Sequence, residues 1–379
     1  NRLLACYDYI AGEKQHQFWP KSDYLALVPN VAEHDLLGGT QFFDALTEDA
    51  RLVQRLIQES LQLGGQAINY AKVTKVSAQQ GKYQVEIELE EQAPSLMLNA
   101  KAVVNACGAW SNVLNINNAT DKNTDLPSTK SEHKSAYKMR PLRGSHLVIP
   151  NWRLPVASVI SIQHPQDKRP VQVYPWQNVT IVGTTDVEHH DDMSVEASIS
   201  QAEFEYLLVC IKQQFPHANI SPDDIISTFS GVRPVTTSGD SLAPSKEKRE
   251  HHIEQQQGLI SVTGGKLTTF RLIAEQVMTA LCQYFSADQQ ADAPDHKQVL
   301  NLACQQAILS KDQATQNAAA TFSPDILQQI QACYGEFSQA FIKVSNANDC
   351  QPIRYSKHLW AELIWAVRFE QIQHLDDLL

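Results

Sequence analysis

The sequence contains no apolar run long enough to cross a membrane as a helix. Its best candidate, residues 270–285, is interrupted by Arg271, Glu275 and Gln276. It also has no excess of basic residues, since its formal net charge is −11 at pH 7. Binding to nucleic acid requires a basic face, so this charge argues against nucleic acid as a general partner. An anionic substrate would therefore have to meet a local basic pocket.

Cysteine pairs and several catalytic signatures are missing as well. The seven cysteines form no C-x-x-C pair and have no metal-ligand spacing, which favours reduced thiols in a cytoplasmic protein. The histidine and aspartate runs at 189–192 and 251–252 do not predict a metal site, because adjacent residues diverge and rarely share one ion. The chain has no P-loop, no G-x-S-x-G and no G-x-G-x-x-G.

Both ends of the sequence lack the usual signals. The chain opens at Asn1 without an initiator methionine or a signal peptide, and it stops at Leu379 without a helix-ending residue. We therefore expect it to be a fragment of a longer protein.

The first part of the chain has the pattern of an α/β domain. Helical spacing of apolar residues predicts a helix over 47–63, with Thr47 as its cap and Gly64 as its stop. Strand-like segments follow at 66–77, 83–89 and 100–106, the first two joined by a hairpin and the third buried. The polar stretch 115–136 is expected to be a surface loop.

The middle of the chain has more strand-like runs and predicts an α+β domain on a mostly antiparallel sheet. These runs lie at 145–150, 156–162, 171–174 and 179–183, with one helix at 201–214. A strand–turn–helix follows from residue 259 to 285. Residues 290–379 read as helices, and their most apolar face is expected at Leu359, Trp360, Leu363, Ile364 and Val367.

The turn at 264–269 carries two glycines and Lys266 between an apolar strand and a helix. Glycine lets backbone N–H groups approach a ligand, and a helix N-terminus attracts negative charge. This turn therefore suits an anionic ligand, although a Gly-Gly pair before a helix is also a common structural turn.

Two further segments carry residues suited to chemistry. His146 follows Gly144 and Ser145, close to Arg140 and Arg143, and could exchange a proton near neutral pH or merely pack at a strand start. Arg233, between Gly231 and Pro234, is expected on a stiff turn. There it could grip a phosphate or carboxylate, or instead cap backbone carbonyls. Arg249 could join it, although its charged run is more typical of a solvated loop.

Small residues after strands mark two places where a flat ligand could approach the backbone. One is Gly183-Thr184-Thr185-Asp186, and the other runs from Asn105 to Trp110. Each could equally be an ordinary turn.

Taken together, these motifs resemble the FAD-dependent, quinone-linked glycerol-3-phosphate dehydrogenases over nearly the whole chain. The matching stretches, in the family's order, are 49–53, 69–73, 103–110, 143–150, 183–186, 230–234 and 261–271, with 360–370 and 375–377 near the end. The family's N-terminal glycine loop for the FAD pyrophosphate and the glycine- and arginine-rich segment after it have no counterpart. We therefore expect this chain by itself to bind FAD poorly or not at all, so that it could be inactive alone.

The resemblance implies a D-amino-acid-oxidase-like flavoprotein fold. Its parts are expected as a partial Rossmann-like FAD-binding domain, an antiparallel-sheet substrate domain and a C-terminal helical domain. The boundaries follow as 1–44 (substrate domain), 45–114 (FAD-binding), 115–136 (loop), 137–252 (substrate domain), 253–287 (FAD-binding return) and 288–379 (helical).

The resemblance also implies a reaction and a set of roles. sn-Glycerol 3-phosphate would be oxidised to dihydroxyacetone phosphate, with the hydride passing to FAD and the electrons to a membrane quinone. Arg233, Lys266 and Arg249 would bind the substrate, and His146 would accept its hydroxyl proton. The expected FAD contacts are Val73, Ala106, Gly108, Trp110, Gly183, Thr184, Gly231, Gly265, Leu267 and Thr268.

Other readings stay open. The chain could instead be a related flavin oxidase of an amino acid or 2-hydroxy acid, which would use Arg233 to bind a carboxylate. It could also be a non-catalytic fragment without a cofactor. We expect the protein in the cytoplasm. The resemblance leaves open whether it attaches to the inner face of the cytoplasmic membrane and whether it forms a homodimer. Trp360 and Trp365 would lie on the bilayer or in a core.

Overall fold

The computed structural model describes residues 6, 8–10, 16–79, 81–89, 94–111, 115–117, 138–237, 250–256, 258–286, 322–346, 348–354 and 356–378. The chain divides into two units, which we describe separately. The first comprises Asn1–Asp44, Val73–Glu86 and Met97–Ala287, and the second comprises Ala45–Lys72, Ile87–Leu96 and Asp288–Leu379. The finer predicted division into substrate and FAD-binding segments stays a prediction.

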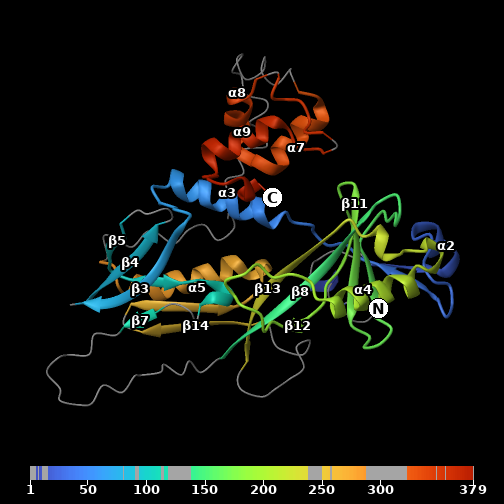
Figure 1. Ribbon diagram of the computed structural model, residues 1–379, viewed down its shortest axis with the longest axis horizontal. Helices are drawn as coiled ribbons and strands as arrows, with labels where there is room; N and C mark the ends of the chain where they lie inside the picture. Colours follow the sequence, from blue (N-terminus) through green and yellow to red (C-terminus); the bar gives the residue numbers. More distant parts are fainter. Residues whose placement is uncertain are drawn as a thin grey trace. The chain divides into compact units, whose positions relative to one another are not determined.

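The first unit is built on a six-stranded antiparallel sheet around the long strand β8 (Lys138–Pro150). The strands lie in the order β12-β8-β11-β10-β9, and β13 pairs with β8 along the opposite edge (Figure 1). The bounds are β9 (Ile160–Gln163), β10 (Pro170–Trp176), β11 (Val179–Gly183), β12 (Val187–Glu188) and β13 (Ser227–Thr237). The predicted antiparallel sheet is confirmed and a strand forms at each of the four predicted runs, although the run predicted at 156–162 begins only at Ile160; β12 and β13 were not predicted.

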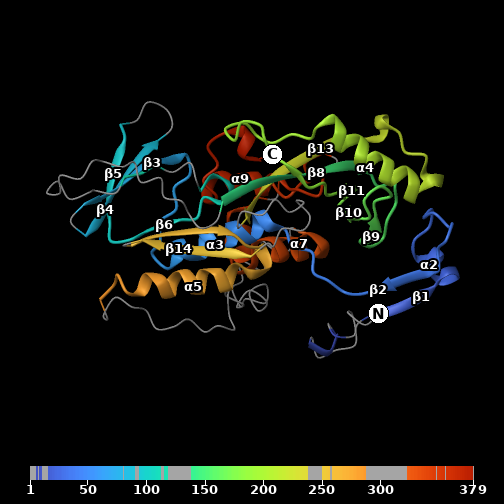
Figure 2. The same ribbon diagram turned by 90° about the horizontal axis from the view of Figure 1, so that it is seen from below.

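Helix α4 (Gln201–Gln214) forms, as predicted, and packs on one face of this sheet (Figure 2). The Ser200 side chain caps this helix by accepting from the Glu203 backbone N–H, and the Glu203 side chain accepts from the Ser200 backbone N–H. Side chains alternate along a strand, so Leu147 and Ile149 of β8 point to the same face and join Leu207 in the buried core.

A small sheet carries the predicted strand–turn–helix. β15 (Leu259–Gly264) pairs with β14 (His251–Gln256) and, in parallel, with β6 (Val103–Asn105), and it continues through η5 (Leu267–Thr269) into α5 (Phe270–Cys282). The prediction that the strand within 100–106 is buried was only partly right: Asn105 is buried, but Val104 is 39% exposed.

A four-stranded sheet has the order β5-β4-β3-β7 and contains the predicted hairpin strands. Its strands are β3 (Ala71–Gln79), β4 (Lys82–Leu89), β5 (Leu96–Ala100) and β7 (Asn115–Asn117). The loop predicted from residue 115 was wrong at its start, because β7 pairs in parallel with β3. The rest of that segment, 118–136, lies outside the described residues. Near the start of the chain, β1 (Gln17–Pro20) pairs with β2 (Gly38–Gln41), with α2 (Lys21–Leu27) between them.

Most of the described part of the second unit is helical, and its residues after 322 confirm the helices predicted within 290–379. Its helices are α3 (Asp49–Gln62), α7 (Pro324–Tyr334), α8 (Ser338–Val344) and α9 (Trp360–Phe369), with short helical turns at Gly335–Phe337 and Leu375–Leu378. Arg51 of α3 lies with its guanidinium carbon 4.9 Å from the ring centre of Tyr334 and pairs with Glu370 at 2.8 Å. None of the helices within the described ranges is long and apolar enough to cross a membrane.

One prediction about these helices was wrong, and another was only partly right. Thr47 does not cap α3: the helix begins after Glu48, and no side chain caps it. The expected apolar face of α9 is buried only in part: Leu359 is 1% exposed, but Trp360 and Val367 are 51% and 58% exposed, whereas Trp365, outside that face, is 2% exposed. This helix carries apolar residues nearly all round, so periodicity alone cannot select the face that packs.

Candidate active site on one face of the sheet

The two faces of β8 carry different chemistry. The side chains of Arg143, Ser145 and Leu147 point toward α4. Because successive side chains on a strand point to opposite faces, Gly144 and His146 lie on the other face. The β13 register sets Phe229 opposite His146, Gly231 opposite Gly144, and Arg233 opposite Leu142. Gly144, His146, Phe229, Gly231 and Arg233 therefore share one surface, which we call the site face.

Arg233 lies on the site face with its guanidinium directly over Gly144. A Cβ atom at Gly144 would come within 2.2 Å of Arg233 Nη1, so only glycine leaves room for this arrangement. Arg233 Nη2 donates to Thr184 Oγ1 at 2.9 Å. The prediction that Arg233 sits on a stiff turn was wrong: it lies within β13, where Pro234 is paired with Pro141 and neither has an N–H to donate.

His146 lies beside Arg233 in an enclosed position. Its ring stacks on Phe229, with centroids 4.4 Å apart and planes 8° from parallel, and it covers Gly183, where a Cβ would lie 2.2 Å from the ring Cδ2. Nδ1 is buried with no hydrogen-bond partner among the described residues. Burial, followed by the charge of Arg233, lowers the pKa of His146 to about 4. His146 is therefore neutral at neutral pH and can accept a proton.

This low pKa leads to a direct prediction. When His146 is followed by NMR from pH 8 downward, its ring signals should remain those of the neutral form to about pH 5 and titrate near pH 4. Comparison with the His146→Gln spectrum identifies the signals among the 13 histidines. Arg233→Gln removes one cause of the shift, so it should raise the midpoint. A wild-type midpoint between 6 and 7, near the ordinary value of about 6.5, would contradict the described burial.

A carboxylate that the sequence did not single out by itself stands behind Arg233. Asp186, whose side chain is 1% exposed, lies with Oδ1 3.6 Å from Arg233 Nη1 and Oδ2 3.2 Å from Arg169 Nη2. A buried carboxylate between two arginines balances their charge and fixes their direction. The strand-end motif at 183–186 was noticed in the sequence, but its pairing with Arg233 depends on the sheet register.

The turn after β15 is shaped for close backbone approach. Gly264 and Gly265 adopt φ values of 75° and 92°, and a Cβ at Gly265 would lie 2.7 Å from Ile273 Cδ1. Lys266, Leu267 and Thr268 follow it in exposed positions at the start of the helical segment. The first N–H groups of a helix have no partner within it, so this turn can receive negative charge.

The turn η1 (Gly108–Trp110) contacts β8, β13 and β15 and so belongs to the same region. Gly108 has a φ of 57° with open space where a Cβ would stand, and Ala106 is exposed just before it. Trp110 Nε1 donates to the Met193 carbonyl at 2.8 Å.

The other predicted site residues are less closely placed. Val73 lies on β3, in the four-stranded sheet, and is 37% exposed. Arg249 lies outside the described residues. In the part of the chain that the structure describes, no group of three metal-ligating side chains comes together.

Comparison with known proteins defines the class. The family described as FAD dependent oxidoreductase matches residues 2–278, and the chain belongs to this family. This result confirms the predicted flavoprotein fold and enzyme class, with FAD as the cofactor.

Three proteins similar to this chain are named as glycerol-3-phosphate dehydrogenases. The chain is 25% identical over 394 residues to the aerobic glycerol-3-phosphate dehydrogenase of Staphylococcus haemolyticus, covering 100% of this chain and 68% of that protein. The corresponding Staphylococcus aureus protein is 24% identical over 390 residues, covering 99% and 67%. The glycerol-3-phosphate dehydrogenase of Bacillus halodurans, solved with FAD, has the same fold, with a TM-score of 0.73, 23% identity and coverage of 95% and 69%.

The residues around the site face fit a flat anionic cofactor. A Cβ at Gly231 or at Gly108 would meet nothing within 4 Å, so open space adjoins both backbones. The turn at Gly265 offers helix N–H groups of the kind that suit the electron-rich edge of a flavin. These residues would hold the ring end of FAD.

Proposed function

We propose that this chain, when loaded with FAD, oxidises sn-glycerol 3-phosphate to dihydroxyacetone phosphate, with quinone as the final electron acceptor, in glycerol metabolism. The observation that carries this proposal is the pair formed by neutral His146 and Arg233 on one sheet face. A 2-hydroxy substrate with an anionic group needs a base and a cation side by side, and the relatives named as glycerol-3-phosphate dehydrogenases support phosphate as that anion.

In this proposal some residues of the site bind the substrate and one accepts a proton. Arg233 binds the substrate phosphate through its planar fork, with Lys266 as a second cation. His146 Nε2 accepts the proton of the C2 hydroxyl as the C2 hydrogen leaves with its electron pair. When bound, FAD supplies the acceptor for that hydride. Arg249 stays a proposed third cation, and attachment to the inner face of the membrane and homodimer formation stay proposals too.

A carboxylate substrate is the second candidate, because an arginine grips a carboxylate and a phosphate with the same geometry. The test is dye reduction by the FAD-loaded protein with glycerol 3-phosphate, 2-hydroxyglutarate and glycine in parallel. We expect reduction with glycerol 3-phosphate alone. Reduction with either of the other two and not with glycerol 3-phosphate would replace our proposal with the carboxylate one.

A further inference from the structure

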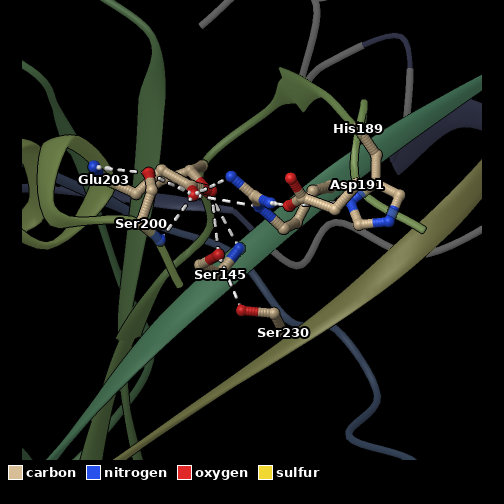
Figure 3. A network of polar contacts seen from close by, with 8 residues as sticks. Ser145, His189, Asp191, Ser200, Glu203 and Ser230 are labelled. Atoms are coloured by element: carbon tan, nitrogen blue, oxygen red, sulfur yellow. Dashed lines mark hydrogen bonds and ion pairs between the residues drawn. The ribbon is translucent and has the colours of Figure 1, made fainter. Parts of the chain in front are cut away.

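A buried carboxylate lies on the other face of the same sheet, behind the site. Glu203 of α4 has a side chain only 3% exposed. Its Oε1 accepts from Ser145 Oγ at 2.8 Å and Thr185 Oγ1 at 2.7 Å. Its Oε2 accepts from Arg143 Nη2 at 2.8 Å and from the Ser200 backbone N–H at 3.0 Å (Figure 3). One side chain thus joins β8, the segment between β11 and β12, and the start of α4.

This carboxylate is charged despite its burial. Desolvation raises its pKa, but hydrogen bonds from Thr185, Ser200 and Ser145 outweigh that effect and lower the pKa of Glu203 to about 2. Charge-assisted hydrogen bonds of this kind are stronger than neutral ones. Arg143 balances the charge and is itself also paired with Asp191 at 2.6 Å.

The residues held by Glu203 are chain neighbours of the site. Ser145 directly precedes His146. Thr185 directly follows Thr184, the hydroxyl that receives Arg233 Nη2. Thr185 Oγ1 also accepts from the Ser145 backbone N–H at 2.8 Å, so the 183–186 segment is tied to β8 at the gap between β11 and β12.

A third link reaches β13. Ser145 Oγ lies 2.8 Å from Ser230 Oγ, and Ser230 directly follows Phe229, on which His146 stacks (Figure 3). Successive side chains on a strand point to opposite faces. Ser145 and Ser230, on the α4 face, therefore each have a chain neighbour on the site face, His146 and Phe229.

We propose that Glu203 is a positioning residue for the site: acting through the sheet, it holds Thr185 and Ser145 so that Arg233 and His146 keep their places beside each other. The proposal rests on the proposed function, in which these two residues bind and deprotonate the substrate. Glu203 itself touches neither the substrate nor the cofactor.

Thr185→Val tests the link without changing any charge. Glycerol 3-phosphate affinity, measured by calorimetry, should fall by up to about tenfold, because Arg233 is held less firmly once the buried hydrogen bond to Glu203 is lost. The NMR titration midpoint of His146 should rise toward 6.5, because Arg233 is no longer held beside the ring. Thr185→Ser, which restores the hydroxyl, should return both values to about those of the wild type.

Thr180→Val is the matched control. Thr180 is also fully buried on the same sheet, and its hydroxyl donates to the Leu154 carbonyl at 2.6 Å, away from the site. It loses the same chemical group, so a general loss of packing would appear in both variants. We expect unchanged affinity and an unchanged His146 titration in this control.

Glu203→Gln gives an independent test, because the two possible effects would change the pKa of His146 in opposite directions. Removing a negative charge would by itself lower the pKa of a nearby histidine, whereas freeing Arg233 raises it. We expect a rise. Arg143 keeps Asp191 as a partner in this variant. Asp224→Asn is its control, since Asp224 also caps a helical turn, at Ser221, and pairs with an arginine, Arg153 at 3.0 Å.

The outcomes separate the two proposals. An FAD-loaded wild-type protein that neither binds nor oxidises glycerol 3-phosphate would overturn the proposed function, and the His146 titration would still test the role of Glu203. An unchanged midpoint in both Thr185→Val and Glu203→Gln, with the fold intact by circular dichroism, would overturn that role.

Discussion

His146→Gln is expected to lower kcat for glycerol 3-phosphate by about 10²- to 10⁴-fold, the usual contribution of a positioned proton acceptor. The imidazole is neutral, stacked on Phe229 and placed against Gly183, so its unprotonated ring is held in one position. Glutamine has similar bulk and polarity but no basic nitrogen. KM should change little, because Arg233 still binds the phosphate. Steady-state dye reduction measures both constants, and the flavin absorbance of the same sample checks the FAD content.

The matched control is His164→Gln. His164 lies in the first unit and is fully buried, whereas His146 is half-buried; like His146 it stacks on an aromatic ring, Tyr206, with centroids 3.5 Å apart and planes 6° from parallel. Its replacement should reduce thermal stability and leave kcat within about twofold of the wild type. If His146→Gln kept most of its kcat, another group would have to accept the proton, and the role given to His146 would be wrong.

Local patterns in the sequence were sufficient for much of the fold. The four strand runs of the main sheet, helix α4 and the turn into α5 all lie where alternation, helical spacing and glycine punctuation predict them. These signals need only neighbouring residues. Strand β13 escaped prediction because Gly231 and Pro234 resemble a turn, and only pairing with β8 makes them part of a strand.

The site itself was predicted in parts and not as a constellation. His146 and Arg233 were chosen by residue type, but their meeting depends on the register between β8 and β13. The role of Gly144 follows from that register as well, since the glycine makes room for a guanidinium from another strand. Glu203 was not singled out at all. Its partner Ser145 is 58 residues away, and no local pattern records that contact.

Arg233→Gln is expected to reduce kcat/KM for glycerol 3-phosphate by roughly 30- to 4000-fold, the equivalent of about 2–5 kcal/mol for losing one partner of a close charge pair. The loss should fall mainly on KM, because the arginine binds an anionic group that is not changed by the reaction. Arg153→Gln removes an equivalent arginine that pairs with Asp224 away from the site face, and its kinetics should match the wild type.

Gly144→Ala separates the position of Arg233 from its charge. The new methyl group would stand 2.2 Å from Nη1, so the guanidinium, as the end of a flexible side chain, must move away while its charge remains. If the fixed position matters, this variant should lose part of the affinity that Arg233→Gln loses, with thermal stability close to that of the wild type. If only the positive charge mattered, Gly144→Ala would leave the KM for glycerol 3-phosphate unchanged. Wild-type KM in Gly144→Ala would therefore contradict the view that the site face works by holding one arginine over one glycine beside a neutral histidine.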